Sequence, residues 1–298
     1  LIEFKIYIME LGIKKSSMGE LVKNIDSIFC QTGERYGGKE KFLACVIKDR
    51  EGNVVTSFTG NVNLIDLSNT ITPQTSDNFV NGTWTGTVTI TESIQNNRIY
   101  VTGSNKHGES NLFTVQADEL DHFYISQING FQIAGENISL TIEAQDEFDN
   151  LVESFTGDVV LSDLTNTITP NSVLLTSGSW VGNVKIYNAI QNNLIIVTYS
   201  ASGIEDSTNY FNVESNSVHH ILIRDNAGGL GEEVGDLTFN LNDQIKLYAA
   251  GYDEWGNYVR EVTANWNVIG TIDFPSPLVG EYTIFQPTTP FTLSLIHI

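Results

Sequence analysis

A five-residue motif that begins with aspartate and ends with asparagine carries the side chains best suited to chemistry. This Asp-x-x-Gly/Asp-Asn motif occurs three times, and its defining residues are Asp49, Gly52 and Asn53; Asp146, Asp149 and Asn150; and Asp253, Gly256 and Asn257. The leading aspartate can accept hydrogen bonds from a turn backbone, and Gly, Asp and Asn tolerate positive φ. The motif therefore predicts a tight structural turn between two strands.

The same motif has a second possible role as a calcium site, because it gathers several oxygen ligands in one loop. The candidate ligands are Asp146, Glu147 and Asp149 in the second copy, and Asp253 and Glu254, with Asp225 or Asp236, in the third. The spacing is not that of an EF-hand, and Arg50 stands inside the first copy. A purely structural turn is the favoured interpretation, calcium is the alternative, and no other cofactor is indicated.

Catalytic motifs are missing from the sequence. It contains no Gly-x-Ser-x-Gly, no His-Glu-x-x-His and no P-loop. His122 and His220 recur at corresponding places, which suits a contact near a linker better than catalysis. His219 and His220 are adjacent, so on a strand they point to opposite faces and make a poor metal pair. We expect a protein that is not an enzyme.

Composition excludes several classes of protein. The chain has 298 residues, with 15 Lys+Arg, 36 Asp+Glu and a net charge of −21. This charge argues against binding to nucleic acid or to anionic membrane surfaces, and no apolar run is long enough for a transmembrane helix. Two cysteines exclude a disulfide-rich scaffold. Cys45 aligns with Ile142 and is expected to be a small core residue, with a bridge to Cys30 as the less favoured alternative.

An internal repeat sets the organisation of the chain. Residues 49–73 match residues 146–170 at an offset of 97, with 16 of 25 positions identical, and a third copy begins near Val218. The third copy carries about ten extra residues within 225–236. We predict an uncertain remnant at 1–21, repeats at 22–117, 118–216 and 217–292 (the last truncated), and a sequencing-adapter artefact at 293–298, as in a metagenomic fragment. The linkers, 116–121 and 214–218, are short and polar, which favours stiffness.

Each repeat has the pattern of short strands. Trp84, Gly86, Val88 and Ile90 fall on one face of an extended run, and threonines fall on the other. About seven such strands per repeat, separated by Gly, Asn and Asp turns, predict a two-sheet antiparallel sandwich. Trp84 and Trp180 are expected in the core. Trp255 replaces Phe148 and Glu51 within the turn, and we expect it at a junction between repeats.

These motifs together resemble the bacterial immunoglobulin-like domains of invasin and Big type that occur in surface proteins. The resemblance covers residues 22–291 and is carried by the Asp–Asn motif followed by Val or Leu, by Ser-Phe-Thr-Gly-x-Val-x-Leu and by Gly-x-Trp-x-Gly. It implies an all-β chain of tandem immunoglobulin-like antiparallel sandwiches, elongated in shape. Such modules serve as stalks, adhesins and spacers beside enzymes.

The function expected from this resemblance is that of a non-catalytic stalk or spacer of a secreted or cell-surface bacterial protein, in support of adhesion. Its partners would be neighbouring modules of the same chain, with a host or environmental glycan or protein as a further possibility. Two alternatives stay open. One is an adhesin module that binds a glycan or protein through residues 225–236 or Trp255. The other is an accessory spacer of a secreted hydrolase.

Overall fold

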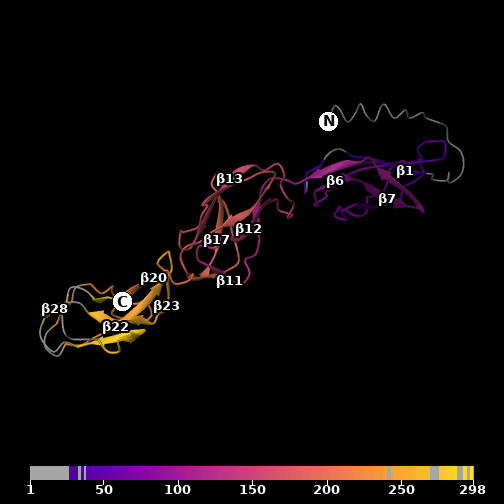
Figure 1. Ribbon diagram of the computed structural model, residues 1–298. Helices are drawn as coiled ribbons and strands as arrows, with labels where there is room; N and C mark the ends of the chain where they lie inside the picture. The colour runs from indigo at the N-terminus through magenta and orange to yellow at the C-terminus, as the bar shows by residue number, and fades with distance from the viewer. Residues whose placement is uncertain are drawn as a thin grey trace. The chain divides into compact units, whose positions relative to one another are not determined.

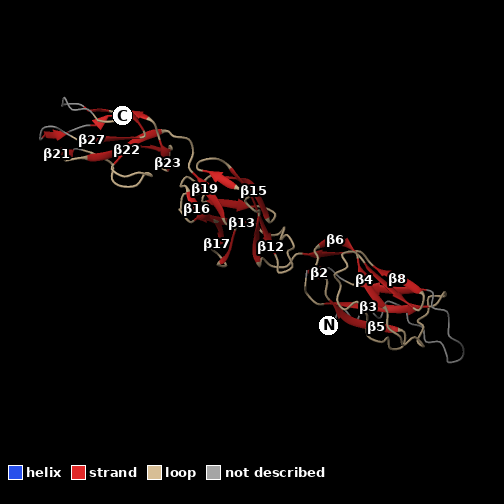
Figure 2. Cartoon of the chain, turned by 90° about the horizontal axis from the view of Figure 1, so that it is seen from below, coloured by secondary structure: helices blue, strands red, loops and turns tan. Residues whose placement is uncertain are grey.

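The computed structural model describes residues 27–32, 35–36, 38–235, 237–239, 243–268, 275–286, 291–293 and 296–297. Every regular element within them is a β-strand (Figure 2), so the predicted all-β class is confirmed. Among these residues no helix is long and apolar enough to cross a membrane. The predicted remnant at 1–21 lies outside the described residues, and so do residues 294, 295 and 298 of the predicted adapter segment.

The first repeat is built from two sheets. Its described strands are β1 (Ser27–Gln31), β2 (Arg35–Tyr36), β3 (Lys41–Lys48), β4 (Asn63–Asp66), β5 (Thr83–Val88), β6 (Ile94–Asn97), β7 (Ile99–Gly103), β8 (Lys106–Ser110) and β9 (Phe113–Gln116). One sheet has the order β4-β7-β8-β1-β3-β5 and the other β2-β9-β6. Neighbouring strands are mostly antiparallel, but β1 runs parallel to β8 and β2 runs parallel to β9.

Both sheets of the first repeat contribute to a single hydrophobic core. Leu43 and Val88 come from the larger sheet, Phe113 and Val115 come from the smaller one, and all four belong to the same buried cluster. In β5 the side chain of Trp84 is buried while Thr85 and Thr87 on the other face are exposed, which is the period-two alternation that a half-buried strand requires. The two sheets therefore form the predicted sandwich.

The second repeat has the same kind of architecture (Figure 1). Its strands are β10 (His122–Ile125), β11 (Phe131–Ile133), β12 (Ile138–Gln145), β13 (Gly157–Asp163), β14 (Ser172–Leu175), β15 (Ser179–Val184), β16 (Ile190–Asn193), β17 (Ile195–Tyr199), β18 (Ile204–Ser207) and β19 (Phe211–Glu214). They pair in the orders β10-β12-β15, β11-β19-β16 and β14-β13-β17-β18.

The third repeat is described in part. Its strands are β20 (His220–Arg224), β21 (Leu237–Phe239), β22 (Ile245–Tyr252), β23 (Tyr258–Glu261), β24 (Ala264–Asn265), β25 (Asn267–Val268), β26 (Val279–Gly280), β27 (Tyr282–Phe285), β28 (Phe291–Leu293) and β29 (Ile296–His297). The central strand β22 pairs with β20, β23 and β27.

The chain forms two compact units, and the boundary between them passes through the second repeat. The first unit comprises residues 1–124, 143–156 and 175–179, and the second comprises 125–142, 157–174 and 180–298. The three repeats defined by sequence therefore remain a prediction of domain organisation. Each contact discussed below between one repeat and the next lies inside one of these units.

One strand of each repeat leads directly into the Asp–Asn motif. β3, β12 and β22 are each eight residues long and end one residue before Asp49, Asp146 and Asp253. Each strand is paired on both sides within its sheet, so the beginning of the motif is held by a central strand. The leading aspartate of the motif therefore follows directly on a strand that is paired on both sides.

The expected core position of Cys45 is confirmed, but the favoured expectation that Cys45 forms no bridge was wrong. Cys30 and Cys45 form a disulfide, with Cα atoms 4.2 Å apart, and both are buried. The reason is the pairing of β1 with β3, which places Cys30 directly opposite Cys45. Alignment of Cys45 with Ile142 correctly indicates a core position, but it carries no information about the strand lying opposite.

Candidate functional site

The three copies of the motif fold into the same tight turn, which we call the Asp–Asn turn (residues 49–53, 146–150 and 253–257). In each copy the aspartate N–H donates to the asparagine carbonyl, over 2.9, 3.0 and 3.0 Å. The N–H of the fourth residue returns to the aspartate carbonyl. That fourth residue has positive φ in every copy: 83° at Gly52, 64° at Asp149 and 87° at Gly256, which explains why only Gly or Asp stands there.

One carboxylate oxygen of the leading aspartate holds the turn itself. Oδ1 of Asp146 accepts the N–H groups of Phe148 and Asn150, each over 3.0 Å. The corresponding bonds recur in the other copies, from Trp255 and Asn257 to Asp253 and from Glu51 and Asn53 to Asp49. The turn is therefore stabilised by residues within the motif alone.

The second carboxylate oxygen reaches the linker that precedes the repeat. Oδ2 of Asp146 accepts the N–H of Asp118 over 2.9 Å, and Oδ2 of Asp253 accepts the N–H of Asn216 over 3.0 Å. Asp118 and Asn216 both belong to the short polar linkers identified in the sequence. A single buried aspartate thus joins a turn to the linker before it.

The terminal asparagine binds a loop of the preceding repeat through its carboxamide. Nδ2 of Asn150 donates to the carbonyl of Thr91 over 2.7 Å, and Oδ1 accepts the N–H of Ser93 over 2.7 Å. Asn257 makes the same pair of bonds with the carbonyl of Tyr187 and the N–H of Ala189, over 2.7 and 2.8 Å. We call residues 91–93 and 187–189 the junction loops. The two asparagines bind only backbone atoms, so these bonds place no requirement on the side chains of the junction loops.

An aromatic side chain in the turn covers a glycine of the preceding repeat. A Cβ atom added to Gly38 would lie 2.1 Å from Cε2 of Phe148, and one added to Gly135 would lie 2.0 Å from Cη2 of Trp255. Both glycines have positive φ, 71° and 76°. Trp255 also packs against Tyr187, with ring centroids 5.6 Å apart. Trp255 therefore lies at a junction, as expected, and its ring is half-buried.

Ionic contacts add to the first junction. Lys39 pairs with Asp118 over 2.5 Å, and the hydrogen bond and charge of Asp118 raise the pKa of Lys39. His122 lies between Asp121 and Asp149, with nitrogen–oxygen distances of 3.2 Å to each. Lys39, Asp149 and Asp121 are largely exposed, so these pairs add little stability compared with the buried hydrogen bonds.

Asp146 and Asp253 remain ionised although they are buried. Burial alone raises the pKa of Asp146, but hydrogen bonds from the Asn150 side chain and from the backbone of Asp118, Asn150 and Phe148 outweigh it, so the net pKa is lowered. The pKa of Asp253 is lowered by the same balance, with Asn216 in the place of Asp118. A negative charge is therefore held at each turn by N–H donors.

The described candidate calcium ligands do not converge in this arrangement, and Asp236 lies outside the described residues. The oxygens of Asp146 and Asp253 already accept N–H groups, while Glu147, Asp149 and Glu254 are exposed. Within the part of the chain that the structure describes, no group of three or more His, Cys, Asp or Glu could hold a metal ion. As arranged, the turn does not fit the six to eight oxygen ligands that calcium takes.

A second buried aspartate, which the sequence analysis did not single out, organises a loop in the first two repeats. Asp66 accepts the N–H groups of Ser68, Thr70 and Ile71, the hydroxyl of Ser68 and Nδ2 of Asn97. Asp163 accepts the corresponding bonds from Thr165, Thr167, Ile168 and Asn193. The identical segments Asn-Thr-Ile-Thr-Pro and Ile-Gln-Asn-Asn were the available signal, since they place the aspartate and asparagine at matched positions in both repeats.

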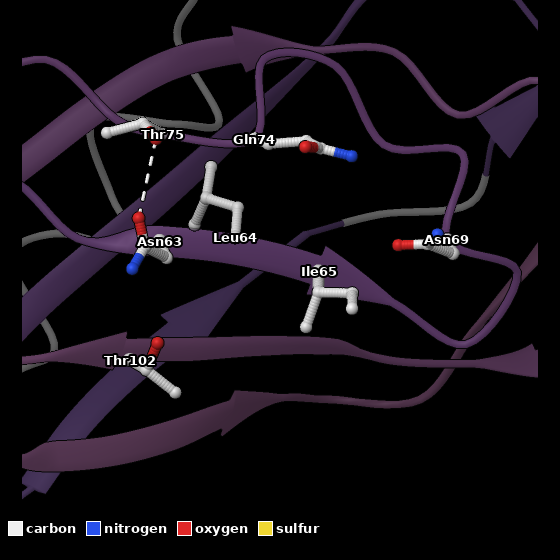
Figure 3. Close-up of a pocket in the computed structure, with 7 residues that line it drawn as sticks. All are labelled: Asn63, Leu64, Ile65, Asn69, Gln74, Thr75 and Thr102. Carbon is white, nitrogen blue, oxygen red and sulfur yellow. Dashed lines mark hydrogen bonds between the residues drawn. The ribbon is translucent and has the colours of Figure 1, made fainter.

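A shallow hollow lies beside β4 in the first repeat (Figure 3). It has a volume of about 330 Å³ and is lined by Asn63, Leu64, Ile65, Asn69, Gln74, Thr75 and Thr102. The Thr75 hydroxyl donates to Oδ1 of Asn63 over 3.4 Å. At the offset of 97, Val160 and Ser162 replace Asn63 and Ile65, whereas Asn166 and Asn171 keep amides at the positions of Asn69 and Gln74.

The extra loop of the third repeat forms hydrogen bonds with other residues of the same repeat. Gly228 N–H donates to Oε1 of Glu261 over 2.7 Å, and the Tyr252 hydroxyl donates to the Gly229 carbonyl over 3.1 Å. Arg224 in turn donates through Nε to the Tyr252 hydroxyl over 3.0 Å. The loop and Trp255, the two features considered for ligand binding from sequence, thus lie in separate networks.

Comparison with known proteins gives structural likeness only. No family model matches the chain, and no curated protein matches it. Among solved structures, FdeC, an adhesin of Escherichia coli, is 15% identical and the match covers 92% of this chain and 99% of that one, with a TM-score of 0.45. InvE, an adhesin of Yersinia pseudotuberculosis, is 15% identical over 72% of this chain and 73% of that one, with a TM-score of 0.30.

A surface-layer protein also appears among the similar structures. Domains 4–9 of SbsC are 15% identical, with 91% of this chain and 47% of that chain covered and a TM-score of 0.29. The match therefore spans about half of the surface-layer segment. Since every one of these TM-scores is below 0.5, the description of the fold rests on the sheets and cores described above.

Proposed function

We propose that the chain is a non-catalytic spacer, a segment of a secreted or cell-surface bacterial protein that holds other parts of that protein apart and supports adhesion. The observation that carries this proposal is the repeated asparagine contact. Asn150 and Asn257 bind the junction loops at Thr91–Ser93 and Tyr187–Ala189 with the same two bonds. This contact recurs between successive repeats and restrains each repeat relative to the next. A spacer needs such a restraint, which repeats joined by flexible linkers alone would lack.

The disulfide supports a location outside the cytoplasm. Cys30 and Cys45 are joined and buried in the core of the first repeat, and structural disulfides persist in oxidising environments. The net charge of −21 fits a surface that keeps adjacent molecules soluble and mutually repelling. This proposed location is in keeping with the similarity to two bacterial adhesins and a surface-layer protein. Adhesion and surface-layer formation are roles of those proteins.

The proposal is tested by small-angle scattering of the full chain, wild type beside Asn150→Ala. We expect the wild type to scatter as a particle much longer than it is wide, with limited flexibility. Loss of the Asn150 carboxamide should increase flexibility while circular dichroism stays unchanged, because the strands themselves are intact. The matched control is Asn53→Ala, which removes the equivalent carboxamide from the exposed first turn.

A compact particle, or equal flexibility in the wild type and Asn150→Ala, would overturn the spacer proposal. A fully flexible wild type would do so as well, since the junction bonds would then have no effect in solution. Stiffening by the variant would contradict the assigned role of Asn150 directly.

A second candidate function is ligand binding at the hollow beside β4. Amide and hydroxyl side chains beside the partly exposed Ile65 form a surface suited to a polar ligand such as a glycan. The second repeat has Val160 and Ser162 in place of Asn63 and Ile65, so the linings of the two repeats differ at these two positions. Glycan-array binding that is lost in Asn63→Ala but retained in Thr198→Ala, which alters the equivalent of Thr102 in the second repeat, would favour this function over a pure spacer.

A further inference from the structure

The first Asp–Asn turn has the same geometry as the two turns that bind junction loops. Asp49 N–H donates to the Asn53 carbonyl over 2.9 Å, and Gly52 N–H donates to the Asp49 carbonyl over 2.9 Å. The N–H of Asn53 donates to Oδ1 of Asp49 over 2.8 Å. The backbone that orients the asparagine carboxamide at residues 150 and 257 is therefore present at residue 53.

The environment of the asparagine differs between the copies. Asn150 is buried, with 6% of its surface exposed, and Asn257 is half-buried, whereas Asn53 is exposed. Among the described residues the Asn53 carboxamide bonds only to Asp49, with Nδ2 at 3.4 Å from each carboxylate oxygen. The corresponding distances from Nδ2 of Asn150 to the oxygens of Asp146 are shorter, 2.9 and 3.0 Å. Nδ2 and Oδ1 of Asn53 can thus still form the two hydrogen bonds that Asn150 and Asn257 form with a junction loop.

We propose that the turn at residues 49–53 is a docking surface for the end of a further repeat of this same kind, placed before the first. The occupant would present a junction loop, with a carbonyl to Nδ2 of Asn53 and an N–H two residues later to Oδ1. This inference deepens the proposed spacer function and rests on it. The two occupied turns at residues 146–150 and 253–257 are the pattern for the docked state.

The chemistry of the contact sets what the occupant must contain. Asn150 and Asn257 recognise backbone groups only, and the junction loops read Thr-Glu-Ser and Tyr-Asn-Ala. The asparagine bonds therefore leave side-chain identity in the loop free and fix only its backbone shape, and the packing of Tyr187 on Trp255 is a separate contact. At the position of Phe148 and Trp255 the first turn has Glu51, which is exposed. The docked first turn therefore relies on the carboxamide and lacks the aromatic cover over a glycine.

The test adds one repeat to the full chain. A copy of residues 27–121 replaces residues 1–24 and is joined to residue 25, which keeps the natural linker length. The added copy carries Glu92→Gln, an exposed change that distinguishes its peptides by mass. Hydrogen exchange is then measured on the peptide containing residues 91–93 of the added copy and on the same peptide of the original first repeat.

We expect the added junction loop to exchange about tenfold more slowly with Asn53 present than in Asn53→Ala, which corresponds to the loss of ordinary hydrogen bonds. Glu51→Phe should slow exchange further, because it restores the aromatic side chain that the other turns carry. The β3 peptides of the two copies have the same mass, so a single slowly exchanging population of this peptide serves as the control for folding of both copies.

Equal exchange in the extended chain and its Asn53→Ala variant would overturn the docking surface. Asn150→Ala in the same extended chain separates this failure from failure of the spacer. If Asn150→Ala accelerates exchange at the original junction loop and Asn53→Ala has no effect, only the docking inference is wrong. If neither variant has an effect, the spacer proposal fails as well.

Discussion

The first and second Asp–Asn turns differ in what surrounds them while their backbones are alike. Both close through the same hydrogen bond, from the asparagine N–H to Oδ1 of the leading aspartate. Only Asn150 is buried, and only its carboxamide reaches a junction loop. The comparison shows that turn formation is local to five residues, whereas the junction depends on an independent surface at the end of another repeat.

The same two repeats also differ in their covalent structure. The first has the Cys30–Cys45 disulfide between β1 and β3, and the second has Ile142 at the position of Cys45. Repeats that share a core pattern are thus held together in different ways. The following predictions test both differences, beginning with the disulfide.

Reduction of the disulfide should destabilise the first repeat and leave the second unchanged. The bridge closes a loop with a sequence separation of 15, for which loop-closure entropy gives about 3 kcal/mol. Denaturation followed by hydrogen exchange of β3 and β12 peptides, with and without reductant, measures the two repeats separately. In the Cys30→Ala/Cys45→Ala variant the reductant should have no effect, and an equal loss in both repeats would contradict the prediction.

Asp146→Ala should give the next largest effect. It removes the acceptor for the N–H groups of Phe148, Asn150 and Asp118, and unsatisfied buried donors together cost about 2–3 kcal/mol. The measurement is urea denaturation reported by exchange of β12. The neighbouring exposed Glu147 provides the control, because Glu147→Ala should change stability by less than about 0.5 kcal/mol. Similar losses in the two variants would contradict the assigned role of Asp146.

Asn150→Ala and Asn53→Ala sharpen the comparison of the two turns in the natural chain. Asn150→Ala loses two hydrogen bonds to the junction loop and should cost about 1–2 kcal/mol. Asn53→Ala, at an exposed carboxamide, should cost less than about 0.5 kcal/mol. Differential scanning calorimetry of the two variants provides the values, and equal costs would show that burial of Asn150 contributes nothing.

Acid should weaken the aspartate-centred loops only below the pH at which it begins to protonate ordinary surface carboxylates. Burial raises the pKa of Asp163, but hydrogen bonds from Thr165, Thr167 and Asn193 lower it by a larger amount. The folded pKa of Asp163 therefore lies below the usual 3.8. A depressed folded pKa means that the stabilisation is complete above the unfolded pKa and is lost as pH falls through the folded value. Melting temperatures between pH 6 and pH 2 should fall less steeply for Asp163→Asn than for wild type.

Calcium should have the smallest effect, with the same melting temperature in calcium and in chelator. The oxygens of Asp146 and Asp253 are occupied by N–H donors, so the folded state gains no calcium affinity over the unfolded chain. A rise in melting temperature that saturates with calcium concentration, and that is abolished by Asp149→Asn, would instead establish the calcium alternative.

Much of the fold could be predicted from the sequence because its signals are local. Alternation of Trp84, Val88 and the intervening threonines specifies which face of β5 is buried, independently of distant residues. The position of Trp255 at a junction could also be anticipated, because Phe148 and Trp255 share a place in a repeated motif. Trp180 was expected in the core but is only half-buried. The alternation of side chains along a strand does not show how completely the opposite sheet covers each of them.

The rest of the site depends on pairings that no local pattern contains. The Cys30–Cys45 bridge follows from the register of β1 against β3, and residues near Cys30 have no repeat counterpart that would show this register. The bonds of Asn150 join residues 57 and 59 positions apart in sequence. Asp66 and Asn97 likewise meet across 31 positions. The sequence repeat indicates that these residues are important, but only the three-dimensional structure shows which residue each of them contacts.

The cross-link between β1 and β3 has a mechanical consequence. When tension is applied to the N-terminal side of the first repeat, it reaches β1, which pairs antiparallel with β3 and could otherwise be peeled away one hydrogen bond at a time. The covalent bond at Cys30 ends such peeling within the strand and passes the load to Cys45 in β3, a central strand with Leu43, Cys45 and Ile47 in the core. Under oxidising conditions the first repeat should therefore withstand greater pulling force than under reducing conditions.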